Sequence, residues 1–192
     1  MRRAPALVAI VVAAALLGGC TLVPTASSPQ IIASEQIPYG LLEPTIPGTN
    51  GASVQFITQP VWIVDATNHL DPASRIVPSP PALSAVLLQL IIGPSSIERD
   101  AGYTSALPPD LVLVSASIRY GVAYINLATS LSHLSHEHQV LAVGQLVFTS
   151  KDMGATTGVE ILEAGHVQEL LLPDGSHTTL ATPAQFETLL SH

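Results

Sequence analysis

The chain has 192 residues, of which 47% are apolar and only 10% are charged. This is enough apolar sequence to bury the core of one domain, with room for appendages. Its 6 basic and 14 acidic side chains give a formal charge of −8. Because an acidic surface repels nucleic acid, we expect no nucleic-acid partner.

The chain opens with a segment that is typical of a secretory signal. Arg2 and Arg3 precede an uninterrupted apolar run over residues 6–17, and small residues follow it. A helix over this run would reach about 18 Å, which is short of the roughly 30 Å hydrocarbon core of a bilayer. We therefore predict a signal peptide over residues 1–19 and no membrane span there.

The residues Leu17-Gly18-Gly19-Cys20 look like a bacterial lipobox, which predicts cleavage before Cys20 and lipidation of its sulfur. Two or three acyl chains, palmitate among them, would anchor the chain stably on the extracytoplasmic face of the cell membrane. The alternative is an ordinary signal peptide whose free cysteine merely follows two glycines. Cys20 is the only cysteine, so no intrachain disulfide can form.

A stretch rich in Pro, Ser and Thr predicts a tether over residues 20–53. Four of its residues are more apolar than a spacer requires, which leaves open whether part of it packs on the domain: Ile31, Ile32, Leu41 and Leu42. Without residues 1–19, 4 basic and 14 acidic residues remain, a formal charge of −10. We expect such a chain to touch the bilayer through its lipid alone.

We predict that residues 54–192 form one domain, which begins with two strands and a helix. An apolar strand over residues 61–64 and a returning strand over residues 75–77 are separated by turn residues. The helix would have Ser79 as its N-cap and would end where Gly93 takes a left-handed conformation. Its apolar stripe follows helical spacing: Leu83, Val86, Leu87, Leu90 and Ile91.

A loop over residues 100–110 and a β-hairpin over residues 111–127 come next. Strict alternation in the first hairpin strand predicts one face made of Val112, Val114, Ala116 and Ile118. A second helix over residues 136–148 would have Ser135 as its N-cap, and Thr182 would open a short C-terminal helix with a capping box.

The predicted chain order is therefore β-β-α-β-β-α-β followed by a short C-terminal helix. Helices that are apolar on one face, together with alternating strands, indicate an α+β fold. We expect two layers, in which a largely antiparallel or mixed sheet carries the two main helices on one face.

The sequence holds no recognisable catalytic signature. It lacks the G-x-S-x-G elbow, the Walker A loop, the H-E-x-x-H zinc motif and the dinucleotide fingerprint. Lipidation would also consume the only thiol. We therefore expect a protein that is not an enzyme and that needs no cofactor.

Three histidines lie close together before the second helix, at His133, His136 and His138. Imidazoles so close in sequence are weak candidates for zinc or copper ligands. On a helix, however, His136 and His138 would diverge by about 200°. We favour a polar lead-in to the helix and expect no metal site.

Other candidate contact residues are scattered along the domain. Arg75 and Arg119 could grip an acidic ligand, although pairing with a neighbouring carboxylate is the simpler role for each. Trp62 lies in a strand, where a large apolar residue is usually part of the core. The best contact surface is the loop of residues 100–110, with Gly102, Tyr103 and Pro108, because loops on rigid scaffolds often carry recognition.

The order of these segments resembles the GerMN domain, named after a spore-germination protein. The resemblance covers about two-thirds of the chain, from Val54 to Pro173. It rests on six segments: VWIVDATNHLDPASRIV with Arg75, LIIGP, the G-x-x-[ST]-x-[LI]-P pattern from Gly102 to Pro108, GVAYINLA, QLVFTSKDM and V-x-[IV]-L-x-x-G.

The resemblance implies a bacterial lipoprotein, which we expect to be actinobacterial, with a non-catalytic interaction module. Its partner would be an envelope protein or peptidoglycan, in assembly, germination-like or signalling roles, and self-association is allowed. Two alternatives stay open. One is a substrate- or metal-binding lipoprotein, and the other, less favoured, is an enzyme acting on the wall or on lipids.

Overall fold

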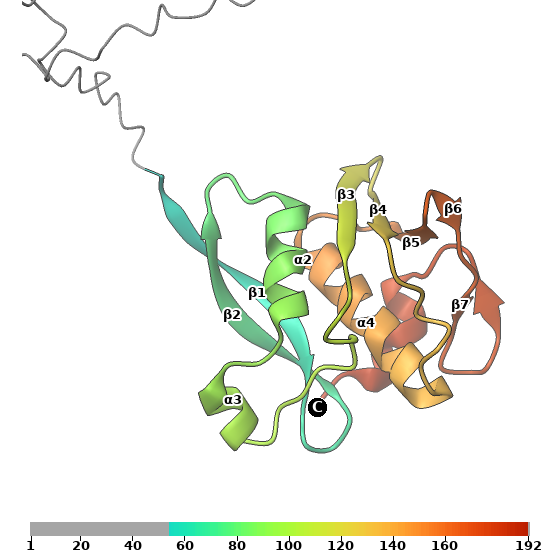
Figure 1. The fold of residues 1–192 in the computed structure, drawn as a ribbon, viewed down its shortest axis with the longest axis horizontal. Coiled ribbons are helices and arrows are strands. Elements are labelled where there is room, and N and C mark those ends of the chain that lie inside the picture. The colour runs from blue at the N-terminus through green and yellow to red at the C-terminus, as the bar shows by residue number, and fades with distance from the viewer. Residues whose placement is uncertain (1–53, 192) are drawn as a thin grey trace, which may run out of the picture. The chain divides into compact units, whose positions relative to one another are not determined.

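The computed structural model describes residues 54–191 (Figure 1). The predicted signal peptide, the predicted lipidation site Cys20 and the predicted tether over residues 20–53 all lie outside the described residues. No helix in the described part is both long enough and apolar enough to cross a membrane.

The domain begins with a long antiparallel ribbon made of β1 (Phe56–Val64) and β2 (Leu70–Pro78). Its register runs from the Phe56–Pro78 pair at the open end to the Val64–Leu70 pair at the turn. Asp65 organises that turn, because its Oδ1 accepts hydrogen bonds from the backbone nitrogens of Thr67 and His69 and from the Thr67 hydroxyl. These donors, led by the His69 amide, lower the pKa of the Asp65 carboxyl.

The first main helix, α2 (Leu83–Ile92), starts later than the sequence predicted. Its N-cap is Ala82 rather than Ser79, since a residue that precedes proline is disfavoured in helical conformation and Pro81 follows Pro80 directly. Its end was predicted correctly. Gly93 follows the helix with φ 81°, and its N–H bonds to the carbonyl of Leu90.

A short helix that the sequence analysis missed, α3 (Ser96–Asp100), follows directly. Ser95 and Glu98 form a reciprocal capping box at its start. Both terminal nitrogens of Arg75 donate hydrogen bonds to the Glu98 carboxylate, each at 2.8 Å. Arg75 also donates to the carbonyl of Gly93. This is the one salt bridge within residues 54–191, and it ties β2 to the segment that leaves α2.

A four-stranded mixed sheet has the order β3-β4-β5-β6. The strands β3 (Leu113–Arg119) and β4 (Val122–Leu127) form the predicted hairpin. The helix α4 (His136–Asp152) then crosses over to β5 (Gly158–Glu163), which pairs in parallel with β4, and β6 (His166–Val167) turns back antiparallel. Ser135 is the N-cap of α4, as predicted.

The strict alternation predicted for β3 is wrong. A register shift between Leu113 and Ser115 leaves Val112 and Val114 exposed, whereas Ala116 and Ile118 pack against the core. A β-bulge adds one residue to the strand, so every side chain beyond it changes face.

The predicted α+β class and element order are confirmed, but the strands divide into separate sheets instead of one. The β1–β2 ribbon, the β3–β6 sheet and a small pair of β7 (Leu170–Leu171) with β8 (His177–Thr178) are not hydrogen-bonded to one another. The helix α2 packs against β1, β2 and β3, and α4 packs against β1, β2 and β5, so the helices join the ribbon to the larger sheet.

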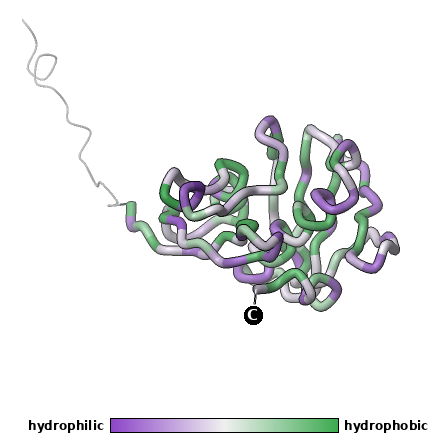
Figure 2. Tube along the Cα trace, turned by 90° about the horizontal axis from the view of Figure 1, so that it is seen from below, coloured by the Kyte–Doolittle hydropathy of each residue, from purple (hydrophilic) through white to green (hydrophobic). Residues whose placement is uncertain are grey.

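The core is built mainly from α4, α2 and the strands they cover. Leu87 and Val147 are fully buried, as the helical spacing predicted. Gly144 of α4 admits the side chains of Leu70 and Leu189 at close range, which lets the C-terminal 3₁₀ helix η2 (Pro183–Leu189) pack on α4. In Figure 2 the hydrophilic stretches lie largely in peripheral turns.

Truncating Leu87 tests this core. Leu87→Ala should lower the free energy of unfolding by about 2–5 kcal/mol, through lost burial and the cavity it leaves. The neighbouring Leu88 is 49% exposed, so Leu88→Ala should cost less than about 1 kcal/mol. Urea denaturation of both variants checks the pair, and equal losses would contradict the assigned helix face.

The Arg75–Glu98 pair predicts a defined pH dependence. Arg75 is the main cause that lowers the pKa of Glu98 from 4.5 to about 2. A carboxyl whose pKa is lower in the folded state stabilises the fold above its unfolded pKa, and this stabilisation disappears as pH falls through the folded pKa. Glu98→Gln should therefore cost about 1–3 kcal/mol at pH 7. The difference from wild type should shrink between pH 4.5 and about 2.

Urea titrations at several pH values measure that difference. Asp110→Asn serves as the control, because it removes an exposed carboxylate from the loop of residues 100–110 that follows α3. A Glu98→Gln deficit that is the same at pH 7 and pH 2 would show that the carboxylate charge does not stabilise the fold.

Candidate functional site

The predicted contact loop, residues 100–110, lies between α3 and β3 and is fixed to the turn end of the ribbon. The backbone of Thr104 exchanges two hydrogen bonds with Val64, at 2.7 and 3.0 Å. The Tyr103 hydroxyl donates to Asp71 Oδ2 at 3.0 Å, and this acceptor raises the pKa of Tyr103. Gly102 has φ 92°, and a side chain there would crowd Ala66.

A buried amide holds the middle of the contact loop. Gln145 of α4 is fully buried, and its Oε1 accepts the N–H of Ala106 at 2.9 Å. Its Nε2 donates to the carbonyl of Trp62 at 2.8 Å. One side chain therefore connects α4, β1 and the contact loop. Its polar atoms are buried, and both the oxygen and the nitrogen of the amide have hydrogen-bond partners.

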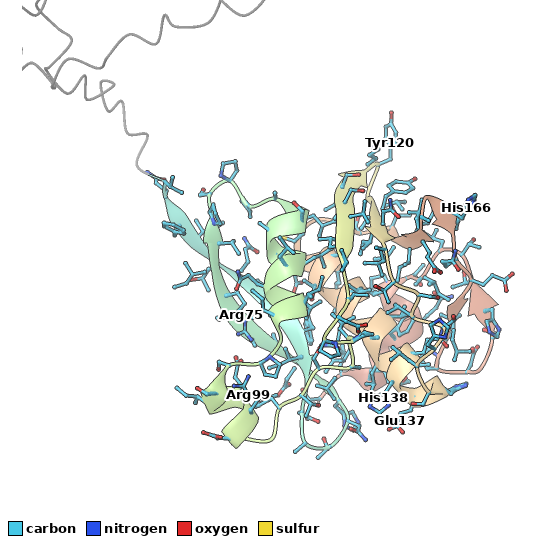
Figure 3. The ribbon with its side chains drawn as sticks, in the orientation of Figure 1. Arg75, Arg99, Tyr120, Glu137, His138 and His166 are labelled. Atoms are coloured by element: carbon cyan, nitrogen blue, oxygen red, sulfur yellow. The ribbon has the colours of Figure 1, made fainter. Side chains whose placement is uncertain are left out.

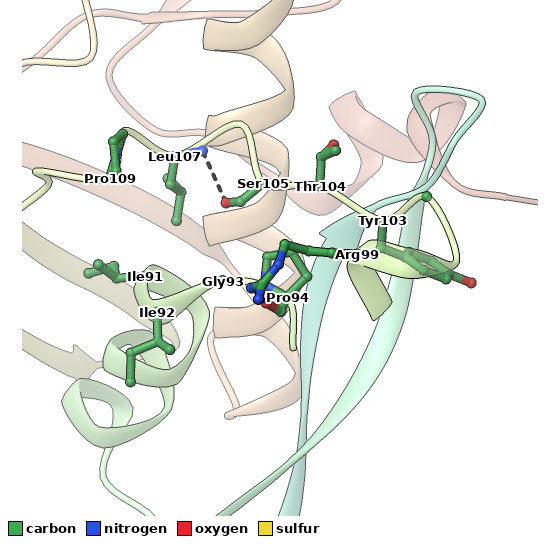
Figure 4. A pocket seen from close by; sticks show the side chains of 11 residues that line it. Ile91, Ile92, Gly93, Pro94, Arg99, Tyr103, Thr104, Ser105, Leu107 and Pro109 are labelled. Atoms are coloured by element: carbon green, nitrogen blue, oxygen red, sulfur yellow. Dashed lines mark hydrogen bonds between the residues drawn. The ribbon is translucent and has the colours of Figure 1, made fainter. Parts of the chain in front are cut away.

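A pocket of about 440 Å³ opens between the C-terminal end of α2 and the contact loop (Figure 4). Its walls are mostly apolar, with Ile91, Ile92 and Pro94 on one side and Leu107 and Pro109 on the other. Two of the three predicted contact residues, Gly102 and Tyr103, line it. Pro108 does not, and the next residue, Pro109, takes that place.

The polar groups of the pocket are few. Arg99 is the only charged residue among the described residues that line it, and one of its guanidinium nitrogens donates to the carbonyl of Pro94 at 2.6 Å. Thr104 and Ser105 add hydroxyls, and Ser105 Oγ accepts the N–H of Leu107. Within residues 54–191, none of the residues that line the pocket is His, Cys, Asp, Glu or Lys. Its chemistry suits recognition of a largely apolar group.

The three histidines do not converge. His133, His136 and His138 are all exposed, and the ring of His138 contacts the Ser135 hydroxyl at 2.9 Å. Within residues 54–191 no group of three or more His, Cys, Asp or Glu side chains is arranged to hold a metal ion. Glu137 instead accepts a hydrogen bond from Asn68 at the ribbon turn.

The remaining candidate residues either stabilise the fold or lie exposed on the surface. Arg75 has the structural role that the sequence analysis preferred, because it pairs with Glu98. Trp62 also serves the fold, since its ring packs on Phe148 at 5.1 Å and its Nε1 donates to Asp152. Arg119 is exposed at the end of β3 and makes no salt bridge to another described residue.

Two important residues were missed from the sequence. Gln145 appeared only as the first residue of the QLVFTSKDM segment, and nothing in that segment indicates that its amide is buried. Arg99 stood outside every motif. The only useful hint was the S-x-x-E spacing of Ser95 and Glu98, which is a capping-box pattern and would have revealed α3.

Comparison with known proteins supports the fold independently. The family model Germane, described as "Sporulation and spore germination", matches residues 60–169. No curated protein matches the chain.

Solved structures give the same picture. The tandem GerMN domains of the sporulation protein GerM from Bacillus subtilis match with a TM-score of 0.50 and 14% identity, over 67% of this chain and 46% of that chain. This chain therefore spans less than half of the tandem structure.

The first GerMN domain of the same protein matches with a TM-score of 0.49 and 15% identity, over 67% of this chain and 98% of that chain. A candidate lipoprotein from Clostridium perfringens matches with a TM-score of 0.43 and 14% identity, over 68% and 94%. These comparisons do not support the expected actinobacterial origin. The family match covers more than half of the sequence and agrees with the α+β fold, and the chain therefore belongs to the Germane family of GerMN-type domains.

Proposed function

We propose that the chain is a lipid-anchored envelope protein whose GerMN-type domain binds another extracytoplasmic protein through the pocket beside the contact loop. The anchor would be the lipid on Cys20, and the domain would act by binding and not by catalysis. The pocket between α2 and the contact loop carries this proposal, because it combines apolar walls with few polar groups.

The exposed residues around the pocket support a protein partner. Ile92 is 73% exposed at the pocket edge, where it costs free energy in water unless another surface covers it. Arg99 adds one cation at the wall of an otherwise acidic chain. A partner segment with an apolar side chain beside a carboxylate would match both features.

Peptidoglycan and a second copy of the chain are other partners that the proposal allows. A sugar chain would call for more polar groups than this pocket supplies, which favours a protein. Self-association would need the pocket to accept an exposed apolar residue of another copy.

One observation favours a second candidate, a carrier of a small molecule. The volume of about 440 Å³ falls within the range of ordinary small-molecule sites. Mass spectrometry of the purified protein under native conditions separates the two, because a carrier would retain a bound small molecule and an interaction module would not.

Substitutions at the pocket edge test the proposed partner site. Ile92→Glu should abolish most capture of the partner, because it places a charge against an apolar contact. Ile97 is 80% exposed and does not line the pocket, so Ile97→Glu is a matched control that should bind normally. Both variants should keep the wild-type melting temperature.

The measurement is crosslinking in native membranes, followed by affinity capture and mass spectrometry. Proteins captured by wild type and by Ile97→Glu, but not by Ile92→Glu, are the expected partners. If Ile92→Glu captures the same proteins in the same amounts, the pocket is not the binding site.

The anchor has its own test. Cys20→Ser should leave the protein either uncleaved or released from the membrane fraction, because the sulfur that carries the lipid is gone. Cell fractionation with a high-salt wash, together with the mass of the N-terminal peptide, reads this out. A Cys20→Ser protein that is cleaved and still membrane-bound would show that another feature anchors it.

A further inference from the structure

The tip of the β3–β4 hairpin, made of Arg119, Tyr120 and Gly121, presents an unusual side chain to solvent. Tyr120 is 100% exposed, and its backbone has φ 52°, in the left-handed region. Gly121 follows with φ 76°, so both turn residues are left-handed. Asn, Asp and Gly fit such turns, whereas a bulky aromatic residue is strained there.

Neither packing nor backbone preference accounts for a tyrosine at this position. The side chain touches no core, and the turn itself would be more stable with Asn. A fully exposed aromatic ring on a strained turn points to a contact outside the domain.

The hairpin tip is held firmly from behind. The backbone nitrogen of Thr157 donates to the carbonyl of Gly121 at 2.9 Å, and its hydroxyl donates to the carbonyl of Tyr120 at 3.4 Å. The segment that joins α4 to β5 therefore supports the turn, and Tyr120 projects from it in a fixed direction (Figure 3).

The tip shares one end of the domain with the start of the ribbon. In Figure 1 the beginning of β1, the end of β2 and the tip all lie at the upper end. The described residues begin at Val54, just before β1. Val54, Phe56 and Ile76 are also exposed apolar residues near the open end of the ribbon.

Acidic groups gather at the opposite end, around the ribbon turn. That turn contains Asp65 and contacts α4 at its N-terminus through the Asn68–Glu137 hydrogen bond, and the contact loop joins it through the Tyr103–Asp71 bond. The helix α3 and the ribbon turn lie at this end (Figure 1). They carry Asp65, Asp71, Glu98 and Asp100, together with the cation Arg99 and with Arg75, which pairs with Glu98. The hairpin tip carries the cation Arg119.

We propose that the hairpin tip rests on the anionic headgroup surface of the membrane, with the Tyr120 ring in the interface and Arg119 against the lipid phosphates. Tyrosine favours the membrane–water interface because its ring is amphipathic, and arginine binds phosphate strongly. This inference rests on the proposed lipid anchor at Cys20. It departs from the expectation that lipid alone touches the bilayer, because that expectation used the net charge and not its distribution.

The anchor makes a small contact sufficient. Because the proposed lipid on Cys20 belongs to the same chain, the domain would meet the membrane as an intramolecular event. In this orientation the acidic end faces away from the anionic lipid. The pocket beside the contact loop, which lies at that end, then faces the extracytoplasmic space.

Tryptophan fluorescence of the full-length, lipidated protein in vesicles tests the orientation. Trp62 is the only native tryptophan, so its emission can be subtracted with the parent protein. The indole introduced by Tyr120→Trp should shift to shorter wavelength on phosphatidylglycerol-rich vesicles and lose intensity with lipids brominated on their acyl chains. Ile97→Trp places the same indole on α3 at the acidic end, and its emission should match that in water.

Other vesicles and variants separate the effect of lipid charge from other causes of the emission shift. The shift should be smaller on phosphatidylcholine vesicles, and adding Arg119→Glu to Tyr120→Trp should abolish it. Tyr120→Asn should melt at the same or a higher temperature than wild type, which would show that the tyrosine does not serve the fold.

Each remaining outcome overturns a stated part. A protein that does not float with the vesicles would overturn the anchor, and the inference with it. A protein that floats while the indole from Tyr120→Trp stays in water would overturn the inference and leave the anchor standing. An indole that is shielded only in native membranes would assign the tip to a protein partner and overturn the lipid contact.

Discussion

The buried amide of Gln145 is the contact on which the geometry of the candidate site depends. It satisfies the carbonyl of Trp62 and the N–H of Ala106 at the same time, in a place that water does not reach. A buried polar group left without a partner costs about 1–3 kcal/mol, so the three segments are stable only together. The contact loop is therefore fixed to the core by a helix that is distant from it in sequence. The wall of the pocket that this loop forms is held in place by its hydrogen bond to α4.

A second constraint acts on the other wall of the pocket. Arg75 and Glu98 hold α3 against β2, and Arg75 also binds the carbonyl of Gly93, where α2 ends. These contacts hold this wall of the pocket in place, and a preformed site loses less conformational entropy on binding than a loop that must first become ordered. The same arrangement brings the carboxylates of α3 close to the start of β2, where Asp71 binds the Tyr103 hydroxyl.

Much of the candidate site could be predicted from local patterns. The turn residues of the contact loop predicted a surface loop, and two of its three named residues do line the pocket. Ser135 was correctly predicted as a cap because capping depends on a few neighbouring residues. Ser79 was not a cap, since two successive prolines keep the chain extended beyond it. Gln145 could not be predicted, because its partners lie 39 and 83 residues away and no local pattern marks them.

Local sequence patterns predict the α+β class, the order of the main elements, the apolar face of α2 and its end at Gly93. Each of these follows from periodicity or from the conformational preference of single residues, which act over a few positions. Local patterns do not predict that α4 is buried on every side from Val140 to Ser150, where a single apolar face was expected. Three features required the three-dimensional structure: the division of the strands into sheets, the face that Ala116 and Ile118 take after the bulge, and the positions of Arg99 and Tyr120. Those features depend on pairing between segments that are distant in the chain, and a register shift of one residue is enough to change them.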